Sequence, residues 1–176
     1  LIKTESYEAG EAGESIGEKT LKTVYSYDIN DRLLESIDYQ IDGAEETAVR
    51  YTEYQYDRRG QTTGYAELSQ ENEPTADEIK AHQIRYHYDS DGKLTKVTYP
   101  TTKNGVHALS YEYDQNGWLT KIKGEIQSGD GSTEKTVRSY TYDSYGKVKE
   151  IKDYRDLLNS SDQAVKKVYT YDSLDR

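Results

Sequence analysis

A seven-residue pattern, Tyr-x-Tyr-Asp-x-x-(Gly or Asp), occurs six times in this chain of 176 residues. Its Asp residues lie 29, 32, 25, 29 and 29 positions apart. Repetition at such a period is typical of architectures in which each unit buries its apolar surface against its neighbours. The repeat therefore limits the fold to a row of similar supersecondary units. The residues that define the copies are Tyr25, Tyr27, Asp28; Tyr54, Tyr56, Asp57, Gly60; Tyr86, Tyr88, Asp89, Gly92; Tyr111, Tyr113, Asp114, Gly117; Tyr140, Tyr142, Asp143, Gly146; and Tyr169, Tyr171, Asp172.

Each copy predicts a β-hairpin. The two tyrosines stand two residues apart, so both rings leave the strand on one face, while a polar residue between them predicts a wet opposite face. The Asp is expected to begin a type I turn and to accept the backbone N–H two residues on. The Gly supplies the left-handed conformation that closes a bulged hairpin, and Asp31 and Asp175 replace it in two copies. The expected turns span 28–31, 57–60, 89–92, 114–117, 143–146 and 172–175.

A second strand is expected after each turn, with apolar residues two and five positions beyond the Gly. Leu119 with Ile122, and Val148 with Ile151, are examples. A spacing of three differs from the strand period of two, so either a bulge lies between these positions or both faces are partly covered. Ser36 departs from the apolar pattern at the second of these positions.

Side-by-side hairpins would align the tyrosines in two columns, whose rings pack against each other and against the apolar residues after the turns. Aromatic cross-strand pairs contribute roughly 0.2–1 kcal/mol each. Gly-rich, acidic stretches at 8–18 and 127–134 are expected to be loops, and Asn104-Gly105 to be a tight turn. The segment from Pro74 to His82 is expected to hold a short helical turn, which accounts for the longest interval.

Composition and charge exclude several functions. The chain has 19 Tyr but no Phe, Met or Cys, a mean hydropathy of −1.05 and a net charge of −10. Disordered chains are poor in aromatic residues, so a folded chain with a tyrosine-based core is expected. The acidic charge argues against nucleic acid and against anionic membranes as partners. Membrane insertion is not expected either, since no long apolar segment is present.

Chemical motifs are weak. The stretch Gly13-Glu14-Ser15-Ile16-Gly17 matches the nucleophile-elbow pattern but lies in an acidic loop without a helix signal. Asp89-Ser90-Asp91-Gly92 resembles the start of a calcium loop, yet the twelfth position is Pro100, where an EF-hand requires Glu. The three His residues lack metal-ligand spacing. We therefore expect no enzyme and no catalytic, metal-binding or cofactor-binding residues.

The six motifs resemble those of the Rhs or YD-repeat family, whose signature is Tyr-x-Tyr-Asp-x-x-Gly followed by an apolar position. That family includes bacterial Rhs toxins, shell-forming subunits of insecticidal toxin complexes, wall-associated proteins of Gram-positive bacteria and animal teneurins. The resemblance covers residues 1–176 as a single array. It implies an all-β fold of tandem antiparallel β-hairpins forming one curved, twisted sheet, an open segment of an Rhs-type barrel or cocoon.

The same resemblance implies a structural wall segment of a secreted or cell-surface protein, cut from a larger bacterial chain, around an enclosed toxin domain. Expected partners are adjacent repeats of the parent polypeptide, or a second copy at the open sheet edges, because unpaired edges invite pairing. The alternative is a carbohydrate-binding or adhesion module in which exposed tyrosines stack on glycans.

Overall fold

The computed structural model describes residues 2–9, 19–100, 104–128, 131–154 and 165–172. Within these residues, twelve strands follow one another through the sheet in sequence order, and neighbouring strands such as β2 with β3 and β8 with β9 pair antiparallel. This confirms the predicted all-β fold of antiparallel hairpins in one sheet. The strands are β1 (Ile2–Ala9), β2 (Lys19–Tyr27), β3 (Leu33–Asp42), β4 (Glu45–Tyr56), β5 (Thr62–Leu68), β6 (Ile84–Tyr88), β7 (Leu94–Thr98), β8 (Asn104–Tyr113), β9 (Leu119–Ser128), β10 (Gly131–Tyr142), β11 (Val148–Asp153) and β12 (Val165–Val168).

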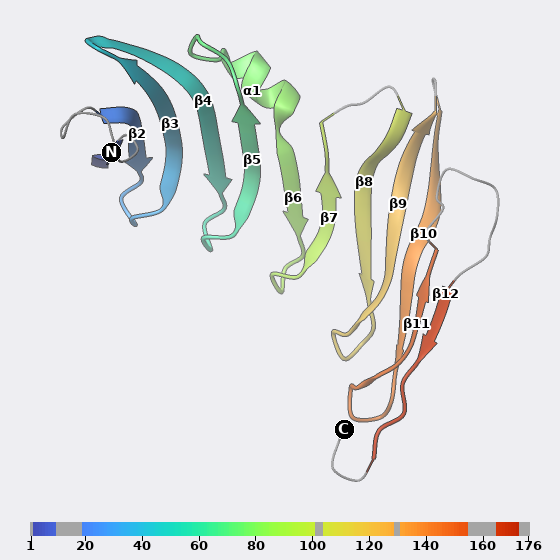
Figure 1. Ribbon diagram of the computed structural model, residues 1–176. Helices are drawn as coiled ribbons and strands as arrows, with labels where there is room; N and C mark the ends of the chain where they lie inside the picture. Colours follow the sequence, from blue (N-terminus) through green and yellow to red (C-terminus); the bar gives the residue numbers. More distant parts are fainter. Residues whose placement is uncertain (1, 10–18, 101–103, 129–130, 155–164, 173–176) are drawn as a thin grey trace. The chain divides into compact units, whose positions relative to one another are not determined.

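The chain forms two compact units, residues 1–85 and residues 86–176. Within the first unit, the turns from β2 to β3 and from β4 to β5 lie at the same, lower end of the strands in Figure 1. Within the second unit, the turns from β8 to β9 and from β10 to β11 share one end in the same way. Each of these four turns contains a motif Asp.

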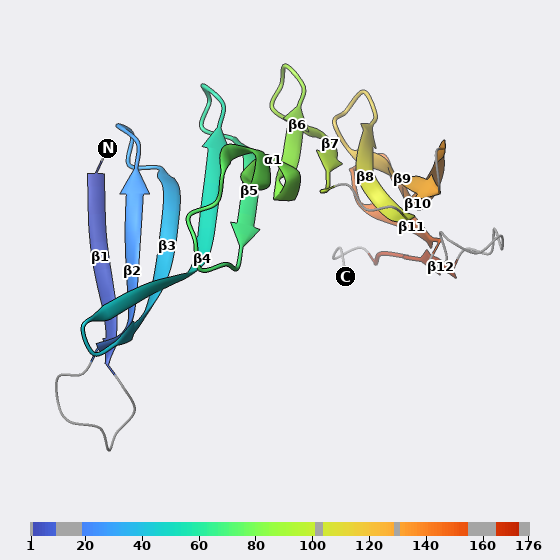
Figure 2. The same cartoon turned by 90° about the horizontal axis from the view of Figure 1, so that it is seen from above.

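One helix interrupts the strand succession. Helix α1 (Ala76–His82) begins at Thr75, whose hydroxyl accepts the Glu78 backbone N–H over 3.3 Å, while the Glu78 carboxylate accepts the Thr75 N–H over 2.7 Å. This capping box satisfies two backbone donors that a helix start leaves open. The predicted helical turn is confirmed, and Figure 2 shows α1 lying against β5 within the first unit.

The first unit buries the sheet face opposite its motif tyrosines. Four side chains of this face are less than a tenth exposed: Ala48, Tyr51, Ala66 and Leu68. Tyr51 pairs with Leu68 across β4 and β5, whereas Tyr54 of the other face pairs with Tyr65. Because α1 and its flanking loop lie against β5, this face has a cover that the motif alone does not provide.

The second unit buries Val97 and Ile126 on the tyrosine face, and Ala108, which is 0% exposed, on the opposite face. Val97 and Ile126 are 5% and 7% exposed, and Tyr111 pairs with Ile122 on the same face. The opposite face of β8, β9 and β10 carries ion pairs between Glu and Lys, among them Lys123 with Glu112 over 2.6 Å and Lys123 with Glu134 over 3.2 Å. Ion pairs of this exposed kind contribute little each, about 0–1 kcal/mol.

Two loop predictions are wrong. Residues 127–128 and 131–134 belong to β9 and β10, where Gly131 pairs with Ser128 and Thr133 with Ile126. Asn104-Gly105 opens β8 and pairs with Ser128 and Gln127, so it is not a tight turn. In both places the strands extend further than turn-forming residue types indicate, because backbone pairing with a long neighbouring strand outweighs local preference. The elbow-like stretch at 13–17 lies outside the described residues.

Candidate functional site

Five described Asp turns share one geometry. In each, a single carboxylate oxygen of the Asp accepts two backbone N–H groups, from the residues two and four positions later. At Asp143 these bonds come from Tyr145 over 2.8 Å and from Lys147 over 3.0 Å. The predicted bond from the residue two positions on is therefore present, and a second bond closes the turn. The same pair of bonds occurs at Asp28, Asp57, Asp89 and Asp114.

The fourth residue of each described turn has the left-handed conformation. Its φ is 86° at Gly60, 84° at Gly92, 83° at Gly117 and 84° at Gly146. Asp31 has φ 59° in the same position, as expected for a residue type that tolerates this region. Residues 173–175 of the sixth expected turn lie outside the described residues.

A bulge directly after four of the described turns explains the spacing of three. Tyr142 pairs with Val148 and Tyr140 pairs with Ile151, so Lys149 is the extra residue of β11. The apolar positions two and five beyond the Gly therefore lie on the same face of the sheet. They are the cross-strand partners of the two tyrosines of the same hairpin. Of the two explanations left open by the sequence, the bulge is correct at this hairpin and at the β8–β9 hairpin, where Tyr113 pairs with Leu119 and Tyr111 with Ile122.

The second tyrosine of a motif bonds to the preceding hairpin. Its hydroxyl donates to the backbone carbonyl of the residue two positions beyond the preceding turn, at 2.7 to 2.8 Å. We call this bond the tyrosine latch. The described latches are Tyr56 to Leu33, Tyr113 to Leu94, Tyr142 to Leu119 and Tyr171 to Val148.

At four of the described turns, the residue directly after the turn covers the ring that forms the latch. We call it the turn-following residue. Arg32 lies 4.9 Å from the centre of the Tyr56 ring and Lys147 lies 5.2 Å from that of Tyr171, which are cation–π distances. Trp118 packs on Tyr142 with ring centres 5.4 Å apart. In these pairs of hairpins, the first thus contributes a carbonyl and a covering side chain to the tyrosine of the second.

Ionisation follows from these contacts. Burial is the main cause that raises the pKa of Tyr56, Tyr113 and Tyr142 above its usual value. The bond from the Arg32 side chain is the main cause that lowers the pKa of Asp28, and the Lys147 backbone N–H does the same for Asp143. These pKa shifts favour the neutral form of the three tyrosines and the charged form of the two carboxylates, which are the forms that their hydrogen bonds require.

Two expectations about the motif are wrong. Tyrosines of successive hairpins do not pair directly, because one post-turn strand lies between them in the sheet order, as β9 does between Tyr113 and Tyr142. A spacing of two strands is about 10 Å, so the post-turn residues are the direct neighbours of each ring. The polar residue between the tyrosines is also not always wet: Ser26 is 3% exposed, and its hydroxyl lies 3.4 Å from the carboxylate of its cross-strand partner Glu35.

The turn-following residue does not stand out in the sequence. Its type varies among the copies, with lysine at two of the five positions, and the tyrosine that it covers lies twenty or more positions away. The signal available was length: every such position holds a long side chain. These residues are Arg32, Gln61, Lys93, Trp118 and Lys147.

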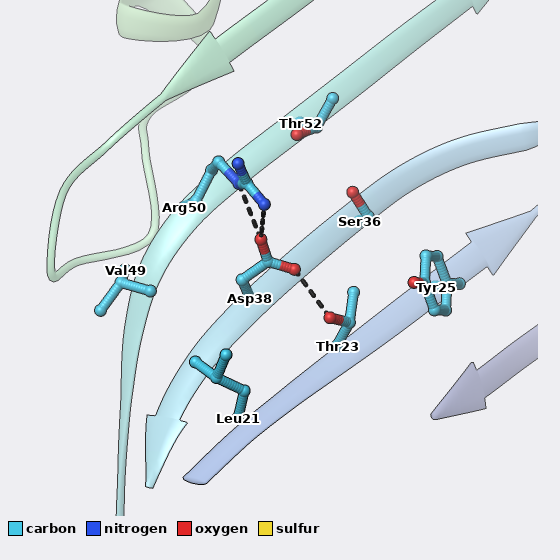
Figure 3. A pocket seen from close by; sticks show the side chains of 8 residues that line it. All are labelled: Leu21, Thr23, Tyr25, Ser36, Asp38, Val49, Arg50 and Thr52. Atoms are coloured by element: carbon cyan, nitrogen blue, oxygen red, sulfur yellow. Dashed lines mark hydrogen bonds and ion pairs between the residues drawn. The ribbon is translucent and has the colours of Figure 1, made fainter. Parts of the chain in front are cut away.

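A hollow of about 560 Å³ lies on the tyrosine face of β2, β3 and β4. Figure 3 shows Arg50 of β4 reaching the Asp38 carboxylate, which also accepts the Thr23 hydroxyl over 2.8 Å. Tyr25 stands at one end of this row, beside Ser36. In the β8–β9 and β10–β11 hairpins the position equivalent to Ser36 holds Ile122 or Ile151, so the short serine leaves the space open.

Within the described part of the chain, no group of three or more His, Cys, Asp or Glu residues is placed to hold a metal ion. Asp89 and Asp91, which resemble the start of a calcium loop, lie in a turn where the Asp89 carboxylate accepts the Asp91 N–H over 2.9 Å. Among these residues no helix is both long and apolar enough to cross a membrane.

The interlocked hairpins define a β-hairpin repeat protein. The model of the teneurin YD-shell family matches residues 4–176, so the chain belongs to this family, and the predicted resemblance is confirmed. A search of curated protein sequences finds no significant match.

A solved structure shows a similar fold. The chain is similar to TcdB2-TccC3-Cdc42, with a TM-score of 0.51 at 18% identity over 88% of this chain and 9% of that chain. Matches to TcdB2-TccC3 and TcdB2-TccC3-TEV have TM-scores of 0.47 and 0.46, each at 14% identity, covering 88% and 86% of this chain. The chain spans about a tenth of the length of these structures.

Proposed function

We propose that this chain is a wall segment of a secreted or cell-surface shell and that it has no catalytic role. Membership of a YD-shell family supports a structural scaffold. The observation that carries the proposal is the recurrence of the tyrosine latch at four hairpins. In each, the motif tyrosine is used to join one hairpin to the preceding one. The motif carboxylates accept backbone N–H groups in their own turns and are likewise engaged in structure.

The resemblance to shell-forming toxin proteins extends this proposal to an enclosed toxin domain. A wall holds its contents away from solvent only while neighbouring hairpins stay joined. Loosening the latches should therefore expose the contents to protease before it unfolds the whole parent protein.

Limited proteolysis of the full-length parent protein tests the wall. We expect the double variant Tyr113→Ala, Tyr142→Ala to make sequences outside this segment newly sensitive to protease. Tyr145→Ala is the matched control, because Tyr145 lies in a turn and is 85% exposed. Equal digestion of the parent protein with and without the latches would overturn the proposal.

The edge strand β12 supports the proposed partners. All four of its side chains are exposed, and it pairs with β11 along one side within the described residues. Lys166 and Lys167 are the charged residues that natural edges use to limit aggregation. We propose that an adjacent repeat of the parent polypeptide pairs with this edge. Analytical ultracentrifugation tests this, because a sedimentation mass that rises with protein concentration would indicate pairing with a second copy instead.

A second candidate function is carbohydrate binding at the hollow on β2, β3 and β4. The paired Asp38 and Arg50 make the hollow close to neutral, and Tyr25 offers an aromatic surface for an apolar sugar face. A volume of 560 Å³ falls within the usual range for small-molecule sites, about 300–1,000 Å³. This combination suits a neutral, hydroxyl-rich ligand.

Ser36→Ile tests this candidate, because it fills the hollow with the residue that other hairpins carry. Titration calorimetry with glucose, galactose and N-acetylglucosamine should show binding that Ser36→Ile abolishes. The control is Ser110→Ile on the opposite face of β8. Absence of binding by the unchanged protein, or binding that survives Ser36→Ile, would remove this candidate without affecting the wall proposal.

A further inference from the structure

The glycines of three turns share one backbone conformation but have different surroundings. Gly60, Gly117 and Gly146 have φ angles of 86°, 83° and 84°. A Cβ atom added to Gly146 would lie 2.7 Å from Cζ2 and 2.9 Å from Cε2 of Trp118. At Gly117 it would lie 2.9 Å from Lys93 Nζ, whereas at Gly60 its nearest neighbour would be Arg32 Nη1 at 3.7 Å.

In all three cases the neighbour is the turn-following residue of the preceding hairpin. One side chain therefore covers the latch tyrosine of the next hairpin and also lies beside that hairpin's turn glycine. Trp118 does this with a rigid ring that packs on Tyr142. Lys93 does it with a flexible chain whose ammonium group lies 5.8 Å from the centre of the Tyr113 ring.

Arg32 is held differently. Its guanidinium bonds to the Asp28 carboxylate over 2.6 Å and donates to the Asp57 backbone carbonyl over 3.1 Å. These bonds direct Arg32 toward the start of the next turn and leave the space at Gly60 open. All three turns thus require a positive φ at this position. They differ in whether the surroundings leave room for a Cβ atom.

We propose that the turn-following residue determines which hairpins can be neighbours. A tryptophan there accepts only a hairpin whose turn closes with glycine. A lysine accepts a residue with a Cβ after a small movement of its chain, and an arginine held as Arg32 is accepts one without movement. The partner of this surface is therefore a hairpin that opens with Tyr-x-Tyr-Asp, and the side chain before it selects the fourth residue of its turn.

The sequence is consistent with this rule. Trp118 precedes the turn that closes with Gly146, whereas Lys147 precedes the turn in which Asp175 replaces glycine. Asp175 lies outside the described residues, so this agreement concerns the sequence alone. The rule deepens the proposed role of the latches in the wall, but it does not depend on whether the wall encloses a cargo.

Three single substitutions on the full chain test the rule: Gly60→Ala, Gly117→Ala and Gly146→Ala. Each introduces the same methyl group at nearly the same φ, so the backbone penalty is shared and the differences report the neighbour. Hydrogen–deuterium exchange of the amides in each altered turn gives the local opening equilibrium. We expect Gly146→Ala to raise opening about tenfold more than Gly60→Ala, with Gly117→Ala between them, since overpacking a rigid ring is costly.

A double variant separates the rule from simple strain. Replacing Trp118 with Lys, the residue found at two equivalent positions, should reduce the effect of Gly146→Ala to that of Gly117→Ala. If Gly146→Ala alone fails to fold, recovery of folding in the Trp118→Lys, Gly146→Ala double variant supports the rule. An effect of Gly146→Ala that is the same in the unchanged chain and in the Trp118→Lys background would overturn the proposal, as would equal effects at all three glycines.

The converse exchange is a further check. In Lys93→Trp the new indole would lie beside Gly117, so Gly117→Ala should become as damaging as Gly146→Ala is in the unchanged chain. Unaltered sensitivity of position 117 would count against the rule. Protease protection of the parent protein is a separate measurement, so failure of the rule and failure of the wall proposal are distinguishable.

Discussion

The hydroxyl of Tyr142 donates a 2.7 Å hydrogen bond to the backbone carbonyl of Leu119, a residue 23 positions earlier in the chain. Leu119 begins β9 and Tyr142 ends β10, so the bond joins the turn ends of two consecutive hairpins. The bond also requires a phenol, which explains why tyrosine rather than phenylalanine stands at the second aromatic position of the motifs that form a latch. A Phe ring could pack in the same place but could not reach the carbonyl.

Removing only the hydroxyl should therefore weaken the joint between hairpins. We expect Tyr142→Phe to lower the free energy of unfolding by about 0.5–1.5 kcal/mol, the net value of one hydrogen bond. Urea unfolding followed by circular dichroism measures this, with Tyr145→Phe as the control because Tyr145 is 85% exposed. Equal stability of the two variants would show that the latch contributes nothing.

Removing the ring should cost more than removing the hydroxyl. Tyr113 is half-buried, its hydroxyl donates to Leu94 over 2.8 Å, and Lys93 lies over its ring. We expect Tyr113→Ala to cost about 2 kcal/mol or more, less than a fully buried aromatic because part of the ring remains exposed. Tyr145→Ala should cost close to nothing, and equal losses in the two variants would contradict the latch model.

The turn carboxylates can be compared within a single turn. The Asp89 carboxylate accepts the N–H groups of Asp91 and Lys93, both over 2.9 Å, whereas Asp91 is an exposed residue in the middle of that turn. Asp89→Ala should destabilise by about 1–2 kcal/mol, as loss of an equivalent helix cap does. Asp91→Ala removes the same charge without losing an acceptor, so thermal unfolding of the pair separates the two effects.

Much of the fold could be predicted because the motif acts locally. An Asp that accepts two nearby N–H groups, and a Gly that supplies positive φ, need no information from the rest of the chain. The contacts between hairpins could not be predicted in this way. The partner of Trp118 is Tyr142, and neither residue type indicates the other until the strand order and the bulge at Thr120 fix the register.

The helix could be predicted from local sequence, whereas the hollow depends on contacts between residues that are distant in the sequence. Thr75 and Glu78 form a capping box that is readable from sequence, so the helical turn was predictable. The need for glycine at position 64 could not be predicted from the sequence. A Cβ atom there would lie 2.5 Å from the side-chain amide nitrogen of Gln83, which directly follows α1. Ser36 likewise departs from the apolar pattern in the sequence, but only the register with Tyr25 shows that this leaves a hollow.

Acid should destabilise the protein through its charged turns and ion pairs. The pKa values of Asp28, Asp143 and Glu112 are lowered in the folded state, first by bonds from Arg32, Lys147 and Lys123 respectively. A group with a depressed folded pKa contributes stability above its unfolded pKa, here 3.8 for Asp and 4.5 for Glu, and loses it as the pH falls. Urea midpoints should therefore decrease below about pH 5. Added salt should reduce the ion-pair part of the decrease, since these groups are exposed.

Alkali should destabilise it through the tyrosines. The bond to Glu67, at 2.5 Å, is the main cause that raises the pKa of Tyr65 to about 12 from an ordinary value of 10.0, and burial raises the pKa of Tyr111 and Tyr142. For an acid whose folded pKa is raised, the stabilising contribution is complete below the unfolded pKa and is lost as the pH rises through the folded one. Urea midpoints should accordingly decrease between pH 10 and about pH 12.

The variant Tyr65→Phe isolates one tyrosine from this alkaline loss. Lysines such as Lys123, whose pKa is raised by bonds to Glu112 and Glu134, titrate in the same direction and remain in both proteins. The difference between the unchanged chain and Tyr65→Phe therefore reports Tyr65 alone, and it should shrink as the pH rises from 10 to 12. A difference that stays constant across this range would show that the Tyr65 phenol ionises as readily in the folded as in the unfolded chain, and that its bond to Glu67 does not form in solution.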